Sequence, residues 1–401
     1  MTRSYFSFGI TGKEFKLLTL TILLALCGGL GLDIHLASLP HIMLELNTNK
    51  QSMQQSITFY MLGGAFSVLV YGPLSDKIGR KPVVFFGLIL FCVTNFLMIT
   101  VHSVQYFLIL RLLQGVGSGV SWGLARIIAA DVMQNERLAA IGSYFTLFLS
   151  LSPLFAPVLG GYIQHWFNWQ ANFIVLGVFI SIVLISFIIF FEETNQHKDS
   201  AAFALKPLLR NYASFFKNRF FVGAVLLGGI SLSINIIYIT LSSFIFQEQF
   251  HTSPIMFGWL TAIVGVSGAV TKVISPVFIL KSKNHKIMNA GIMLILTSGI
   301  FLLIPSAMSY MNIPLVLIGA SIAMVALTLM GTTAMSMALS PFHDKRGSAG
   351  ALFASFQLFL AFALSGLVAI LPYSGTSVLA VIYTLLGLLG IALNKVCLNR
   401  D

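Results

Sequence analysis

Gly-Pro-Leu-Ser-Asp-Lys-Ile-Gly-Arg-Lys-Pro, residues 72–82, is the stretch of this sequence that decides the fold. It stands between two long apolar runs and holds Asp76, Lys77, Arg80 and Lys81 in a chain that is only 9% charged. Its glycines allow the backbone to turn tightly between two hydrophobic helices. We therefore expect a short charged loop that joins two membrane-spanning helices.

Composition indicates a membrane protein along the whole length. The chain is 57% hydrophobic with a mean hydropathy of +0.92, and its 401 residues include only 12 acidic side chains. A soluble domain of this length needs a larger polar surface. Apolar stretches long enough to cross the ~30 Å hydrocarbon core recur throughout, and in lipid they are expected to be helices. The twelve predicted spans are 17–40, 52–75, 83–102, 104–130, 138–163, 172–191, 220–246, 254–280, 287–305, 313–338, 348–371 and 375–394.

Basic residues predict the orientation of these spans. Lys and Arg gather before the first span, in every second loop and after the last span, whereas Lys50 is the only basic residue of the opposite loops. By the positive-inside rule, both termini are expected on the cytoplasmic side of an inner cell membrane. The net charge of +11 therefore reports topology, and no continuous basic block of the kind that binds nucleic acid is present.

Several function classes are disfavoured by missing motifs. The sequence has no phosphate-binding loop, its eight histidines form no ligand cluster, and its three cysteines have neither metal spacing nor an evident disulfide pairing. We therefore expect no enzyme, no metal and no cofactor. The apolar segment near the N-terminus is expected to be a retained helix rather than a secretory signal.

The longest polar break divides the chain into two parts. Residues 192–219 separate an N-terminal six-helix bundle, 1–191, from a C-terminal six-helix bundle, 220–401. Apolar side chains alternate with basic ones inside this linker, at Leu205, Leu208, Leu209, Tyr212, Phe215 and Phe216. The linker is either an amphipathic helix on the membrane face or a solvated connection, and the sequence favours neither.

Three motifs resemble signatures of the major facilitator superfamily: Gly72-x-x-x-Asp76-x-x-Gly79-Arg80-Lys81, Arg111-Leu-Leu-Gln114-Gly115-Val-Gly117 and Ala156-Pro157-Val-Leu-Gly160-Gly161. More narrowly, the runs at 33–40, 71–76, 126–131 and 347–357 are similar to drug:proton antiporters of the bicyclomycin- and chloramphenicol-resistance type. The third motif is associated with drug exporters, although Ser143, Ser152 and Ala156 stand where its glycines are expected. The resemblance implies two six-helix bundles of inverted three-helix repeats that give a central cavity alternating access to the two sides.

Four charged residues fall well inside predicted spans, at Asp33, Arg111, Arg126 and Lys272. Each costs on the order of 3 kcal/mol in lipid, so each is expected to face protein or a water-filled cavity. Asp33 and Arg111 have matching depths and opposite signs, which predicts a pair, direct or bridged by substrate. Asp33 is our candidate proton-coupling carboxylate, with Arg111 as its partner. The alternative is a permanent structural ion pair.

The charged loop is expected to belong to a cytoplasmic gate. The resemblance implies that Arg80 reaches Asp131 and that Asp76 lies near the start of the eleventh span. Arg126 is expected to join this gate with Asp131, and the contacts are expected to lock the two bundles together in one state. The predicted gate comprises Gly72, Asp76, Gly79, Arg80, Lys81, Arg126 and Asp131.

Further polar residues are candidates for a substrate cavity near the membrane midplane. They are His35, Tyr60, Gln114, Asn235, Tyr238, Lys272 and Gln357. Each of them is equally able to satisfy a neighbouring helix.

The function expected from these observations is proton-coupled export of small amphiphilic compounds by a monomer in contact with membrane lipid. One alternative is an exporter or importer of a specific metabolite, such as an amino acid or a siderophore. A remote alternative is a membrane receptor or scaffold that transports nothing, which has little need of buried charges.

Overall fold

The computed structural model describes residues 12–132, 152–196, 198–199, 212–281, 284–342, 346–371 and 375–398. Within these ranges every regular element is a helix. The first part of the chain forms α1 (Gly12–Asp33), α2 (Leu39–Glu45), α3 (Lys50–Ile78), α4 (Arg80–Leu97), α5 (Val104–Gly119), α6 (Ala125–Val132) and α8 (Trp169–Phe190), with a further helical stretch over 152–166. The second part forms α10 (Arg219–Phe244), α11 (Pro254–Lys281), α12 (Asn284–Ala307), α13 (Ile313–Leu339), α14 (Arg346–Ala369) and α15 (Thr376–Leu393). Short 3₁₀ or π-helical turns lie at Leu36–Ser38, Met98–Thr100, Val120–Leu124, Ile245–Gln249 and Asn394–Leu398.

Among the described residues, 11 helical segments are long and apolar enough to cross a membrane. The remaining predicted span, 138–163, lies outside the described residues up to residue 151 and is helical from residue 152. The predicted all-α membrane fold is therefore confirmed.

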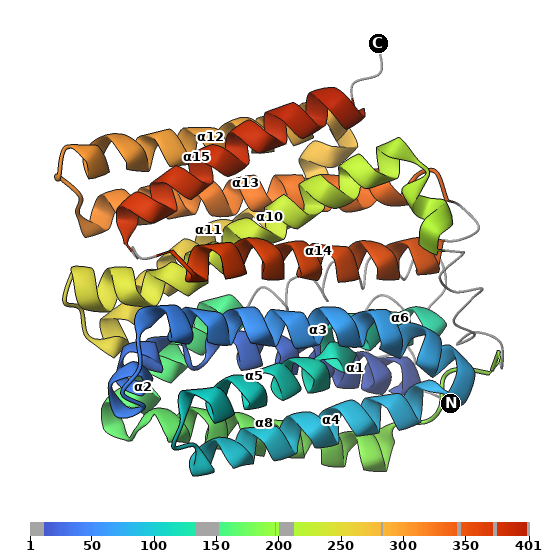
Figure 1. The fold of residues 1–401 in the computed structure, drawn as a ribbon. Coiled ribbons are helices and arrows are strands. Elements are labelled where there is room, and N and C mark those ends of the chain that lie inside the picture. Colours follow the sequence, from blue (N-terminus) through green and yellow to red (C-terminus); the bar gives the residue numbers. More distant parts are fainter. Residues whose placement is uncertain are drawn as a thin grey trace.

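Two groups of helices run along roughly the same direction (Figure 1). We call α1–α8 the N half and α10–α15 the C half; α3 lies beside α14 where the halves meet. α1 begins and α15 ends at the end of the molecule that also holds the turn between α3 and α4. We call this the basic end, and the end at which α2 lies the opposite end.

The linker between the halves is described only in part. Residues 200–211, which include most of the predicted amphipathic pattern, lie outside the described residues. Residues 212–216 are helical, and Phe215 is buried against the rings of Phe221 and Phe342. The last turn of the linker therefore packs against the C half, and the predicted boundaries at 192 and 219 stay predictions.

Asparagine or serine side chains begin several of the long helices. In each case the side-chain oxygen accepts a hydrogen bond from a backbone N–H of the first turn; the capping residues are Asn49, Ser103, Asn168, Asn218 and Asn312. Such a cap contributes about 1 kcal/mol because it satisfies a helical N–H that has no partner in its own helix.

The turn after α3 is shorter than the sequence pattern predicts. α3 continues through Gly72 and Pro73 to Ile78, so that Gly79 alone separates it from α4. Gly79 has φ of +110°, a conformation that residues with a side chain rarely adopt. The expectation of a loop across residues 72–82 is therefore wrong in extent, since one glycine makes the reversal.

Glycines bring α3 and α5 into backbone contact. A Cβ atom on Gly63 would lie 2.2 Å from the carbonyl oxygen of Leu112, and one on Gly115 would lie 2.1 Å from that of Tyr60. Small residues of this kind allow membrane helices to pack closely, since lipid supplies no hydrophobic drive for association. The contact fixes the depth at which the polar side chains of α5 face α3.

Two neighbouring glycines of α3 give a matched test of this packing. Gly63→Ala forces α5 away, and overpacking of this kind costs about 1–3 kcal/mol. Gly64→Ala meets only one atom, at 3.9 Å, so it should leave stability unchanged or raise it slightly. Thermal unfolding in detergent should show a lower melting temperature for Gly63→Ala alone. Equal melting temperatures would contradict the tight α3–α5 contact.

Candidate functional site

Asp33 occupies the junction between α1, the helix over 152–166 and α11. Its side chain is 3% exposed, and it is the only buried carboxylate among the described residues. The hydroxyl of Ser152 donates to its Oδ2 atom at 3.5 Å, and Lys272 of α11 lies within electrostatic reach. Asp33 therefore belongs to the N half but interacts with a charge of the C half.

Arg111 does not pair with Asp33, so the predicted ion pair is wrong for this structure. No ion pair of Arg111 is found among the described residues. Its guanidinium donates from Nη1 to the Gly31 carbonyl at 3.1 Å and from Nε to the Ser56 carbonyl at 3.4 Å, and it lies 4.5 Å from the centre of the Tyr60 ring. Carbonyls and an aromatic face thus replace a carboxylate partner.

A chain of amides extends from Arg111 into the N half. Nη1 of Arg111 donates to Oε1 of Gln114 at 2.8 Å, and Nε2 of Gln114 donates to Oδ1 of Asn95 at 3.1 Å. Asn95 in turn donates to the Phe91 carbonyl at 2.7 Å. Arg111, Gln114 and Asn95 are all fully buried, so this network holds α4 against α5 rather than lining an open cavity.

His35 is fully buried next to the same network. It lies two residues after Asp33, its ring centre is 5.6 Å from that of Phe173, and Arg111 is within electrostatic reach. Neither ring nitrogen has a hydrogen-bond partner among the residues that the structure describes. His35 therefore lies close to the predicted site, with two nitrogens free to take a new partner.

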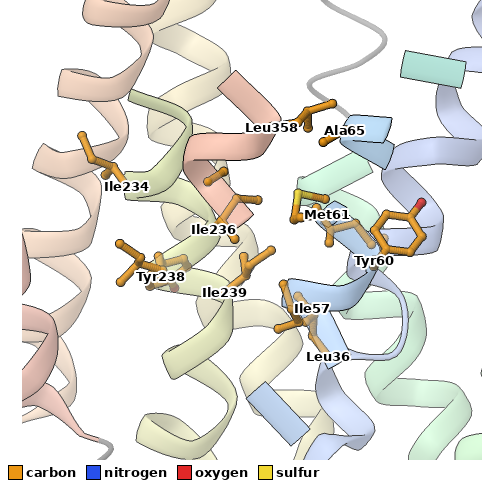
Figure 2. Packing of buried hydrophobic residues seen from close by; sticks show 14 of the residues in the cluster. Leu36, Ile57, Tyr60, Met61, Ala65, Ile234, Ile236, Tyr238, Ile239 and Leu358 are labelled. Carbon is orange, nitrogen blue, oxygen red and sulfur yellow. The ribbon is translucent and has the colours of Figure 1, made fainter. Parts of the chain in front are cut away.

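Three of the candidate cavity residues make their described contacts within their own halves. Tyr60 and Tyr238 point into their own halves (Figure 2): the Tyr60 hydroxyl donates to the Gly28 carbonyl at 2.8 Å, and the Tyr238 hydroxyl lies beside that of Thr261. Gln357 donates to the Gly228 carbonyl of α10 at 2.9 Å, within the C half, and Asn235 is half-buried. The placement of Tyr60, Tyr238 and Gln357 at the cavity is thus wrong for this structure.

Apolar side chains fill the contact instead. Leu36, Ile57, Met61 and Ala65 of the N half face Ile236, Ile239 and Leu358 of the C half (Figure 2). Their pattern along α3 and α10 carries no signal that separates them from ordinary core residues, which is why the sequence did not single them out.

Arg126 and Lys272 are cations without an ion-pair partner among the described residues. Lys272 is half-buried on α11, within electrostatic reach of both Arg126 and Asp33. Arg126 is exposed to solvent. The predicted place of Arg126 in the gate beside Asp131 stays a prediction.

The charged turn forms a network inside the N half. Nε of Arg80 donates to Asp131 at 3.1 Å, as predicted, and its Nη1 donates to Asp76 at 2.5 Å and to Ser75 at 2.6 Å. All of these partners belong to α3, α4 and α6, so none of these bonds joins the two halves. The predicted proximity of Asp76 to the start of the eleventh span stays a prediction.

Glu193 braces this turn, a role that the sequence reading missed. Its Oε1 accepts from the backbone N–H of Arg80 at 2.8 Å, and its Oε2 accepts from that of Lys81 at 3.0 Å. A carboxylate is favoured there by the unpaired N–H groups and the dipole of α4. Thr194 donates to Asp131 at 3.0 Å, so the chain after α8 is tied to the turn twice. The acidic pair after a long apolar run was the available signal.

Direct contacts between the halves lie at the opposite end and also along α3, where the Ser355 hydroxyl of α14 donates to the Ala65 carbonyl at 3.0 Å and the hydroxyls of Thr58 and Ser365 lie 3.3 Å apart. Lys50 at the start of α3 forms an ion pair with Glu248 at 2.5 Å, and the Ser243 hydroxyl of α10 donates to the Leu36 carbonyl at 2.7 Å. Lys50 is the only basic residue of the opposite loops and Glu248 is acidic at the same end, a pairing that the sequence reading missed.

The helix over 152–166 joins both halves through its small residues. A Cβ atom on Gly160 would lie 1.8 Å from the Ile34 carbonyl oxygen, and one on Gly161 would lie 2.4 Å from that of Pro254. The Pro157 carbonyl oxygen lies 2.6 Å from the Cβ position of Gly258. The Pro157–Gly160–Gly161 motif thus packs α1 on one side and α11 on the other.

The brace generates a prediction about pH and charge. Burial alone would raise the pKa of Glu193, but three backbone N–H groups and Lys198 hold that pKa below its ordinary value. A carboxyl of this kind stabilises the folded state above its ordinary pKa, and the contribution is lost as the pH falls through the lowered pKa. Near neutral pH, Glu193→Gln should make the amide hydrogens of Arg80 and Lys81 exchange several-fold faster than in wild type.

Glu192→Gln is the matched control, since the Glu192 side chain is 85% exposed and only reaches Lys13 at 4.0 Å. Hydrogen exchange should be unchanged in this control, and wild type should approach the Glu193→Gln behaviour at acid pH. Identical exchange in the two variants would refute the brace.

The sequence of this chain is similar to those of known membrane proteins. The profile of the Major Facilitator Superfamily matches residues 21–366. The chain is 26% identical over 394 residues to multidrug resistance protein D of Escherichia coli (strain K12), with 94% of both chains covered. It is 25% identical over 355 residues to a bicyclomycin resistance protein homolog of Haemophilus influenzae, with 88% of both covered.

Solved structures agree at the level of the fold. The TM-score is 0.77 with the xylose transporter XylE from E. coli in a partially occluded inward open conformation, at 14% identity over 97% of this chain and 98% of that one. It is 0.69 with the human organic anion transporter MFSD10, at 18% identity over 95% and 99%. The predicted resemblance is confirmed, and this chain is a member of the Major Facilitator Superfamily of membrane transporters.

Proposed function

We propose that this protein exports small amphiphilic compounds in exchange for protons, by alternating access of one site to the two sides of an inner cell membrane. The basic end then faces the cytoplasm, as the positive-inside rule predicts, and the chain works as a monomer without a cofactor. The names of the relatives, which are resistance proteins for bicyclomycin and for multiple drugs, support a drug-like cargo.

The observation that carries this proposal is the position of Asp33. It is buried between the halves, and within the described part of the chain it has no ion-pair partner at 4.0 Å or less and accepts one long hydrogen bond, from Ser152. A carboxyl in this environment has its proton affinity set by whichever water, cation or ligand reaches it. When the halves move, these surroundings change, and so does the occupancy of the proton.

The contacts between the two halves support one stage of the transport cycle, in which the opposite end is closed. The described contacts between halves at the opposite end, Lys50–Glu248 and Ser243–Leu36, close that end, while Arg126 remains accessible to solvent. In this state Asp33 would release its proton toward the basic end and accept cargo. Competition between cargo and proton for one site gives the reciprocal linkage that antiport requires.

The wall between the halves suits an amphiphilic cargo. Leu36, Ile57 and Met61 face Ile236 and Ile239, and apolar walls with a pliable methionine accept varied shapes. Opening this contact would expose the wall on both halves together. His35, which is next to Leu36 in the chain, would then supply a polar contact.

One observation favours a second candidate function, transport of a specific metabolite that carries a carboxylate. Lys272 lies within electrostatic reach of both Asp33 and Arg126, so two cations accompany one carboxylate in this region. An excess of positive charge attracts an anionic or zwitterionic ligand more than a cationic one. Such a cargo would compete with Asp33 for the same cations.

Proton release from purified protein tests the proposed function. Candidate compounds are added to weakly buffered protein in detergent, and the pH change is recorded for wild type, Asp33→Asn and the control Glu192→Gln. We expect release from wild type and the control, no release from Asp33→Asn, and loss of gradient-driven efflux from vesicles of that variant. Retained efflux in Asp33→Asn would refute the coupling role, and release by amino acids alone would favour the metabolite transporter.

The ion pair at the opposite end tests alternating access. The side chains of Lys50 and Glu248 are 41% and 25% exposed, so the pair is worth roughly 0.2–1 kcal/mol. Lys50→Glu replaces this attraction by repulsion and should shift the population about fivefold toward opening at this end. A cysteine placed at Ser243, in a chain without its native cysteines, should then be labelled faster.

The charge-swapped double variant Lys50→Glu/Glu248→Lys is the control, and it should restore the slow labelling of wild type. If the single variant labels no faster, or the double variant stays fast, the pair does not hold this end closed.

A further inference from the structure

α11 and α12 enclose a crevice whose floor is α13. α13 packs extensively against both helices, whereas α11 and α12 barely touch one another. The crevice between them has a volume of about 380 Å³. This volume lies within the roughly 300–1,000 Å³ range of sites that hold small molecules.

The wall of the crevice is apolar. Ile274 of α11, Ile287 and Ala290 of α12, and Val325 and Leu329 of α13 supply most of its surface. The wall also contains the hydroxyls of Thr271 and Ser275, but both donate to backbone carbonyls of their own helix, at 2.7 Å and 3.3 Å. The described lining therefore offers hydrocarbon to an occupant, apart from one cation.

That cation is Lys286, in the first turn of α12 at the basic end of the crevice. Its side chain is exposed and has no ion pair with any described residue, and the neighbouring His285 is exposed as well. Residues 249–343 contain no aspartate or glutamate, so no carboxylate of α11, α12 or α13 is able to neutralise Lys286.

The crevice opens toward lipid. Val270, Val273 and Ile274 on α11 are 48%, 59% and 44% exposed, and apolar side chains of a membrane helix that are exposed in this way face the bilayer. The crevice therefore joins an apolar slot in the membrane to a positive charge at the membrane surface. Phospholipids with an anionic headgroup have the complementary shape and charge.

We propose that this crevice is a binding site for one anionic phospholipid of the leaflet at the basic end. An acyl chain occupies the slot between Ile274, Ala290 and Leu329, and the headgroup phosphate contacts Lys286. Because the chain leaves one apolar environment for another, selectivity comes from the headgroup charge. One lysine near a membrane surface contributes a preference of about fivefold, or about 1 kcal/mol, over a zwitterionic lipid.

Native mass spectrometry of the full chain tests this site. The protein is released from detergent containing equal amounts of phosphatidylglycerol and phosphatidylethanolamine with identical acyl chains, and the bound lipid is counted. Wild type should retain one phosphatidylglycerol with about fivefold preference. Lys286→Gln should remove the preference while keeping some lipid, and Ala290→Phe, which fills the slot, should remove the lipid itself.

Lys13→Gln is the matched control, because Lys13 is a highly exposed lysine at the basic end of the N half. It should bind lipid as wild type does, and equal melting temperatures of all variants show that they fold. Equal retention of the two lipids by wild type would overturn the proposal. The proposal would also be overturned if the phosphatidylglycerol peak were undiminished in both Lys286→Gln and Ala290→Phe. Loss of a drug-like ligand rather than lipid in Ala290→Phe would overturn it as well.

Discussion

The backbone contact between α3 and α5 is the constraint on which the rest of the N half depends. With Gly63 and Gly115 in the contact, carbonyl groups of α1 and α3 come within reach of the Arg111 guanidinium, which therefore needs no acidic partner. This leaves Asp33, at similar depth, without its expected counter-ion. Because the packed helices themselves satisfy the Arg111 charge, the Asp33 carboxyl is left for the proposed exchange with protons or ligands. The close approach of the helices is thus a condition for the proposed chemistry of the site.

The two ends of the molecule are held by different kinds of interaction. At the basic end, Glu193 and Arg80 tie helices of one half to each other, so the turn after α3 can travel with the N half as a rigid piece. At the opposite end, Lys50 and Glu248 tie one half to the other and are partly exposed, which makes their bond weak and reversible. Strong contacts inside a half and weak contacts between halves suit rigid-body rocking.

The sequence predicts how deep a residue lies along its helix axis. It does not predict toward which side of the helix the side chain points. The spans and the burial of Asp33 follow from spacing and hydropathy, whereas the Arg80–Asp131 contact was implied by the resemblance to the family. Matching depth alone suggested that Asp33 and Arg111 meet, and that Tyr60 and Tyr238 face the cavity, but depth does not say which way a side chain points. Helix rotation is set by close contacts such as Gly160 on Ile34, which involve distant segments of the chain. Glu193 was missed because it acts through backbone N–H groups that every residue has.

Arg126 and Lys272, which form no ion pair with any described residue, have an electrical consequence. A charge that crosses the full membrane field gains or loses roughly 2.3 kcal/mol per 100 mV, and a partial displacement gains or loses the corresponding fraction. Any rocking that moves these side chains along the membrane normal is therefore biased by the resting voltage, even when the cargo itself is neutral. The energised membrane would act on the protein directly, as well as through the proton that we propose Asp33 to carry.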